Sequence, residues 1–188
     1  MIAFQELESR ASKLLRESGL ESPPVDLVAL AKKLRVTVEQ QDLGASVSGL
    51  VVRGPDGRVV IGVNASHHPN RQRFTIAHEI GHHLLHKGSA TVFVDNHMVH
   101  FRDDDRTPGA DPREVEANAF AAALLMPEPW LRKDLRRESR DLSDDATVRT
   151  LATRYQVSQQ ALTFRLVNLH LLSGLSSRRD RLPRRKRP

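Results

Sequence analysis

The motif His78-Glu79-Ile80-Gly81-His82 constrains this chain of 188 residues more than any other feature. It lies in a segment with helical periodicity, where residues four apart are separated by about 40° around the axis and about 6 Å along it. Two imidazoles in that arrangement can bind one metal ion, and the Glu79 carboxylate can reach a water on that ion. Zinc peptidases use this pattern, so the sequence predicts a metal-dependent hydrolase.

The residues around the motif agree with a helix that has two different sides. The apolar side chains fall nearly opposite His78 and His82 on a helical projection, and they are Ile76, Ala77, Ile80 and Leu84. One side can therefore pack on a core while the other faces a cleft. Gly81 narrows the helix at a propensity cost of about 1 kcal/mol, which a packing or functional role should offset.

A catalytic zinc site needs a third protein ligand. His86 continues the row of His78 and His82, but it lies about 12 Å along the axis from His78, and ligand bonds of about 2.1 Å cannot bridge that span. The motif with a third histidine after a glycine is also absent, since Leu85 and Gly88 occupy those positions. The chain has no cysteine, so the third ligand must be a histidine or a carboxylate from another segment.

A second predicted helix, 111–127, is the best source of that ligand. Asp111 suits the N-cap, Pro112 the first helical position, and Glu114 the third position of a capping-box-like start. Glu116 has no such local role and lies on the apolar stripe with Ala119, Phe120 and Ala123. A buried carboxylate requires a cation, and zinc would supply one.

We therefore predict Glu116 as the third metal ligand. The alternative ligands are Glu114, His97, His100 and Asp95. A different interpretation of Glu116 is an ion pair with a buried arginine. Alanines along this helix would allow it to approach the histidine helix closely.

The segments 71–86 and 116–127, in this order and spacing, resemble the ImmA/IrrE family of metallopeptidases, and a weaker resemblance extends from about residue 20 to about residue 172. The resemblance implies an intracellular zinc endopeptidase that cleaves a helix-turn-helix transcriptional repressor and so relieves repression in a stress, DNA-damage or mobile-element response. By matching position it implies His78, His82 and Glu116 as zinc ligands and Glu79 as the catalytic acid/base. The loop 95–110 matches nothing in the family pattern, so no residue is assigned to polarise the substrate carbonyl.

The expected fold class is α+β: a mainly helical zincin-like core, a small antiparallel β-sheet and a C-terminal helical segment that resembles a helix-turn-helix. Periodicity and turn residues predict helices in 4–19 and 23–34 and strands in 36–43, 47–52, 58–63 and 91–94. The sequence Gly54-Pro55-Asp56-Gly57 predicts a hairpin turn between the second and third strands.

We expect a metallopeptidase domain in 1–130, a helical segment packed on it in 131–174 and a disordered basic tail in 175–188. Segments 146–155 and 159–172 predict the helix pair, with Ser158 as the cap of the second helix. Gln159 and Gln160 could contact adenine if this helix entered a DNA groove, but structural packing is the favoured role.

The net charge of +6 belongs to the tail, because 176–188 contains seven basic residues and one acidic residue, while the rest holds 22 of each. The tail could make a weak nucleic-acid contact. No apolar run approaches the roughly 20 residues that cross a membrane, and no secretion signal is visible, so we expect no membrane partner and a cytoplasmic location.

Zinc, one ion per chain, is the expected cofactor, although manganese or iron could occupy a site of histidine and carboxylate ligands. One alternative is a DNA-binding transcriptional regulator with a non-catalytic metal site. A second is an interaction protein in which zinc only clamps two helices, but a structural site has four protein ligands and has no use for a base such as Glu79.

Overall fold

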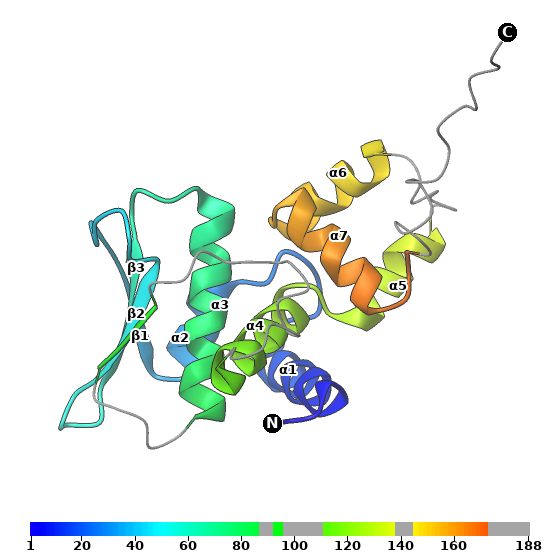
Figure 1. Ribbon diagram of the computed structural model, residues 1–188. Coiled ribbons are helices and arrows are strands. Elements are labelled where there is room, and N and C mark those ends of the chain that lie inside the picture. The colour runs from blue at the N-terminus through cyan, green and yellow to red at the C-terminus, as the bar shows by residue number, and fades with distance from the viewer. Residues whose placement is uncertain (87–91, 96–110, 138–144, 173–188) are drawn as a thin grey trace, which may run out of the picture.

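The computed structural model describes residues 1–86, 92–95, 111–137 and 145–172 (Figure 1). It has the predicted α+β class. The helices are α1 (Phe4–Ser18), α2 (Leu27–Lys33), α3 (Pro69–Leu85), α4 (Pro112–Leu125), α5 (Glu128–Arg137), α6 (Asp145–Tyr155) and α7 (Gln159–Asn168). The strands are β1 (Val36–Gln41), β2 (Gly49–Arg53), β3 (Val59–Asn64) and β4 (Val92–Asp95).

The described strands form one sheet in the order β1-β3-β2-β4. β2 runs antiparallel to both β3 and β4, as expected, but β1 pairs with β3 in parallel. The first three strands alternate in direction along the chain, so β1 and β3 point the same way. Because β3 lies between β1 and β2, β1 pairs with β3 and the pairing is parallel. The sheet is therefore mixed: the predicted antiparallel pairing holds for β2 with its two neighbours, whereas the β1–β3 pair is parallel.

The ends of several elements follow the predicted local chemistry. Gly19 closes α1 in the left-handed conformation at φ 70°, and Gly57 turns the β2–β3 hairpin at φ 79°. The Gly57 N–H donates to the Gly54 carbonyl at 3.1 Å. A residue with a side chain is strained at such φ values, so glycine fits both positions.

Helix α3 lies between the sheet and α4 (Figure 1), contacting β2 and β3 on one side and α4 on the other, while α1 packs on α4. Its residues from Phe74 to His82 are all buried. The histidine side of α3 is therefore buried together with its apolar side, and the cleft that the sequence predicts on the histidine side stays a prediction.

Gly81 has the packing role that its sequence position predicts. A Cβ at this residue would lie 3.3 Å from both the Cα and the carbonyl oxygen of Ala117 on α4. Backbone therefore meets backbone where the two helices cross, and a larger side chain on α3 would push α4 away.

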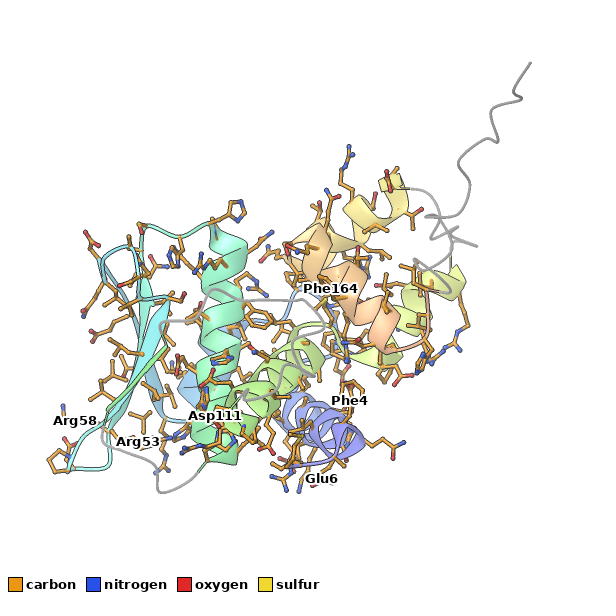
Figure 2. The ribbon with its side chains drawn as sticks, in the orientation of Figure 1. Phe4, Glu6, Arg53, Arg58, Asp111 and Phe164 are labelled. Atoms are coloured by element: carbon orange, nitrogen blue, oxygen red, sulfur yellow. The ribbon has the colours of Figure 1, made fainter. Side chains whose placement is uncertain are left out.

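The C-terminal helix pair forms as predicted, with the Ser158 hydroxyl accepting from the Ala161 N–H at 3.0 Å. Arg165 on α7 is buried; its guanidinium donates to both Glu8 carboxylate oxygens, at 2.5 and 2.8 Å, and to the Met126 carbonyl at 3.0 Å. It also lies over the ring of Phe4, labelled in Figure 2. These contacts join α7 to α1 and to the end of α4.

Gln159 and Gln160 are exposed, and DNA contact by this pair stays a prediction. Helix α5 runs across the expected domain boundary at residue 130, and the tail 175–188 and most of the loop 95–110 lie outside the described residues. Within the described part of the chain, no helix has both the length and the apolar character that a membrane crossing requires.

Substituting Gly49, at the start of β2, tests how closely the sheet approaches α3. A Cβ there would lie 2.3 Å from Thr75 Cγ2. We expect Gly49→Ala to lower the free energy of unfolding by about 1–3 kcal/mol through overpacking. Thr75→Ser removes the clashing methyl group, so the double variant should lose less stability than the sum of the single variants, as measured by urea unfolding in a double-mutant cycle. Additive losses would contradict this packing.

Substituting Arg165 tests the attachment of the C-terminal helices. Arg165→Ala leaves the Glu8 carboxylate and the Met126 carbonyl without their donor, so we expect a loss of about 2–4 kcal/mol in the free energy of unfolding. Arg149→Ala on the exposed side of α6 is the matched control and should stay within about 0.5 kcal/mol of wild type. Equal effects of the two variants would show that Arg165 does not hold α7 in place.

Candidate metal centre

Three side chains that can bind a metal come together between α3 and α4: His78, His82 and Glu114. The Nε2 atoms of His78 and His82 are 2.9 Å apart. One Glu114 oxygen lies 3.3 Å from His78 Nε2, and the other lies 3.2 Å from His82 Nε2. Among the described residues, this is the group whose ligand atoms lie close enough together to share an ion.

The spacing of these atoms fits zinc. Ligand bonds of about 2.0–2.1 Å in a tetrahedral arrangement place ligand atoms about 3.3 Å from one another. Each histidine nitrogen has a different Glu114 oxygen at about that distance, and the two nitrogens need to separate by only a few tenths of an ångström. Two imidazoles and one carboxylate, without thiolate, are also a donor set typical of catalytic zinc.

Glu114 reaches the histidines from the first turn of α4. The N-cap and the following proline are as predicted: Asp111, labelled in Figure 2, accepts from the Arg113 N–H at 2.9 Å, and Pro112 begins the helix. The sequence predicts that Glu114 takes part in a capping box. Its carboxylate does not, because one oxygen faces His78 and the other faces His82. Burial alone would raise the pKa of Glu114, but hydrogen bonds and charge from the two histidines lower it well below its usual value.

Glu116, the residue predicted as third ligand, lies elsewhere. Its Oε2 is 3.1 Å from His86 Nε2, and its Oε1 accepts from the Ile2 N–H at 2.5 Å. The carboxylate is buried as expected, but among the described residues its partners are His86, the Ile2 N–H and the Met1 amine, the last at 3.9 Å, and not the arginine of the alternative interpretation. The structure thus brings Glu114 to the two histidines in place of Glu116. The side chains of Asp95, His97 and His100, which the sequence also offers as ligands, lie outside the described part of the chain.

Asn118 is a site residue that sequence reasoning missed. Its Oδ1 is 2.9 Å from His78 Nδ1, the ring nitrogen that faces away from Glu114. A metal-binding histidine usually donates its second N–H to such an acceptor, which fixes the ring and its tautomer. The signal was present in the sequence, because Asn118 follows Glu114 by four residues and so lies on the same face of α4.

The environment of His82 favours metal binding. Burial lowers the pKa of His82, although the Glu114 carboxylate acts in the opposite direction. A lower pKa means that the imidazole is neutral near pH 7, which is the form that binds a metal. The His82 imidazole therefore does not have to lose a proton before it binds a metal ion.

Glu79, the predicted acid/base, is fully buried on α3 next to His78. A Cβ at Gly49 would lie 3.4 Å from Glu79 Oε1, which places this carboxylate against the start of β2. It therefore lies on the sheet side of α3, whereas Glu114 approaches from α4. A tetrahedral zinc ion held by these three described residues would have one further position for water or substrate, which hydrolysis requires.

Comparison with known proteins shows which family this chain resembles. The model of the IrrE N-terminal-like domain, Peptidase_M78, matches residues 31–167. The radiation response metalloprotease IrrE of Deinococcus radiodurans is 39% identical over 83 residues, which cover 44% of this chain and 24% of that protein. The uncharacterized immunity region protein 2 of Bacillus phage phi105 is 25% identical over 142 residues, which cover 76% of this chain and 81% of that protein.

A solved structure of a Mycobacterium tuberculosis transcriptional regulator has a similar fold, with a TM-score of 0.59 and 21% identity. The match covers 86% of this chain and 46% of that one. The chain therefore matches about a quarter of IrrE and about half of this regulator. Because the family model spans most of the chain, the protein belongs to the IrrE N-terminal-like, or ImmA/IrrE, family of metallopeptidases.

Proposed function

We propose that this protein is a cytoplasmic zinc-dependent endopeptidase that cleaves a helix-turn-helix transcriptional repressor. The observation that carries the proposal is the convergence of His78, His82 and Glu114 between α3 and α4. Glu79, which follows His78 directly in the sequence, is buried on α3. Three protein ligands and an adjacent base are what a hydrolytic site requires, whereas a zinc clamp would have a fourth protein ligand. Among the described residues, three gather at this point.

In this proposal His78 and His82 bind zinc through Nε2 and Glu114 through its carboxylate, with Asn118 orienting His78. When bound, zinc would act as a Lewis acid that lowers the pKa of a bound water to about 7 and polarises a carbonyl. Glu79 takes a proton from the attacking water and returns it to the leaving amine. Its burial against the start of β2 restricts the movement of this carboxylate.

The family resemblance supports the proposed substrate class. Resemblance to ImmA/IrrE peptidases implies a repressor as substrate and a stress, DNA-damage or mobile-element response as the setting. The names of two relatives point the same way, since one is a radiation response metalloprotease and the other belongs to a phage immunity region. A protein substrate is thus the natural partner of this site.

A DNA-binding regulator with a non-catalytic metal site is the competing function. The helix pair α6–α7 and the fold likeness to a transcriptional regulator favour it. That likeness is a likeness of fold, and the base Glu79 has no role in a regulator. Operator binding that resists salt and survives removal of zinc would support this alternative.

Replacing Glu79 separates catalysis from metal binding. Glu79→Gln keeps the shape of the side chain but cannot accept the proton, so cleavage of a co-encoded helix-turn-helix repressor should fall by at least about 100-fold. Zinc content, measured by atomic absorption, should stay at that of wild type. A variant that still cuts the repressor at the wild-type rate would remove Glu79 from the mechanism.

Replacing Glu114 tests the ligand set. We expect Glu114→Ala to weaken zinc binding by more than about 100-fold, because loss even of an outer-shell partner costs about 10–100-fold. Zinc affinity would be measured by competition with a chromophoric chelator, with the exposed Glu21→Ala as the control. Wild-type affinity in Glu114→Ala would exclude Glu114 as a ligand.

A further inference from the structure

The second ring nitrogen of His82 faces another histidine. While His82 Nε2 points to His78 and Glu114, its Nδ1 lies 3.1 Å from Nδ1 of His86, one helical turn further along α3. The two rings are 5.2 Å apart between centroids. His86 is too far along the helix to join the ligand set, and this contact gives it a different relation to the site.

The chain of contacts continues to α4 and to the N-terminal segment. His86 Nε2 lies 3.1 Å from Glu116 Oε2, and Glu116 Oε1 accepts from the backbone N–H of Ile2. Only 9% of the His86 side chain and 8% of the Glu116 side chain are exposed. The contacts are thus shielded from water. Hydrogen bonds that are shielded in this way orient their partners most strongly.

The hydrogen positions along this chain follow from metal binding. If His82 binds an ion through Nε2, its Nδ1 carries the proton and donates to His86 Nδ1. His86 Nδ1 must then be the acceptor, so the proton of a neutral His86 is on Nε2, where it donates to Glu116. The two Glu116 oxygens accept from His86 and from the Ile2 N–H, so each N–H along these contacts has an acceptor.

We propose that His86 and Glu116 are positioning residues that fix the ring orientation and tautomer of His82 for metal binding, with the Ile2 backbone holding the Glu116 carboxylate in place. This inference rests on the metal site of the proposed function. In this arrangement Glu116 acts on the metal site only through His86. His86 is then the outer partner of His82, as Asn118 is the outer partner of His78. The buried carboxylate is then explained without making it a ligand.

The test measures zinc affinity, by chelator competition, in His86→Leu, His86→Gln and Glu116→Gln. We expect His86→Leu to lose about 10–100-fold and Glu116→Gln about 10-fold, the range for removal of outer-shell partners. His86→Gln should recover part of the loss, because its amide oxygen can still accept from His82 Nδ1–H. The control is His170→Gln, at an exposed histidine outside the site, with unchanged affinity.

Two further measurements separate positioning from folding. The thermal unfolding of the metal-free variants should match that of metal-free wild type, and the visible spectrum of the cobalt-substituted protein should shift in His86→Leu, because the orientation of a ligand has changed. Glu116→Gln preserves shape and keeps the test valid if His86→Leu fails to fold.

Affinity within twofold of wild type in both His86→Leu and Glu116→Gln would overturn the positioning role. So would complete loss of zinc in Glu116→Gln, since Glu116 would then be a ligand itself. Glu114→Ala distinguishes this failure from failure of the proposed function. If that variant loses zinc while the His86 and Glu116 variants do not, the metal site stands and the positioning role falls.

Discussion

The close packing of α3 against α4 is the contact on which the metal centre depends. Gly81 lets the backbone of α4 approach to van der Waals distance at Ala117, and Glu114 lies one turn before that contact on α4. His78 and His82 flank Gly81 on α3, so the crossing of the two helices determines how far the carboxylate lies from the imidazoles. Because the two backbones meet at van der Waals distance, even one added methyl group at the crossing would alter the ligand geometry.

The same pair of helices supplies the outer contacts of both histidines. Asn118 on α4 accepts from His78, and Glu116 on α4 holds His86, which faces His82. One short helix thus provides a candidate ligand and two outer partners at positions 114, 116 and 118. The third ligand and the outer acceptors are therefore fixed relative to one another by a single rigid element, and this rigidity favours a preformed site.

Much of this arrangement could be predicted from the sequence, because it depends on local spacing. The motif at 78–82, the cap at Asp111, the hairpin at 54–57 and the helix pair near the C-terminus all follow from short patterns. The third ligand could not be chosen in this way, since Glu114 and Glu116 project from different sides of α4 and their partners lie on α3 and at Ile2. The sequence correctly predicts that Glu116 is buried, but burial alone does not identify the group that its carboxylate contacts. The position of β3 between β1 and β2 likewise depends on pairing between segments that are far apart in the sequence. The alternation of apolar and polar residues within each strand does not reveal that pairing.

The central claim is that His78, His82 and Glu114 bind one ion that keeps a position open for water. Anomalous diffraction at the zinc absorption edge, from crystals grown with one equivalent of zinc, tests it most directly. We expect one strong peak at about 2.0–2.2 Å from the two Nε2 atoms and a Glu114 oxygen, with solvent as the remaining ligand. A peak bound by Glu116 in place of Glu114, or one closed by a fourth protein ligand, would contradict it.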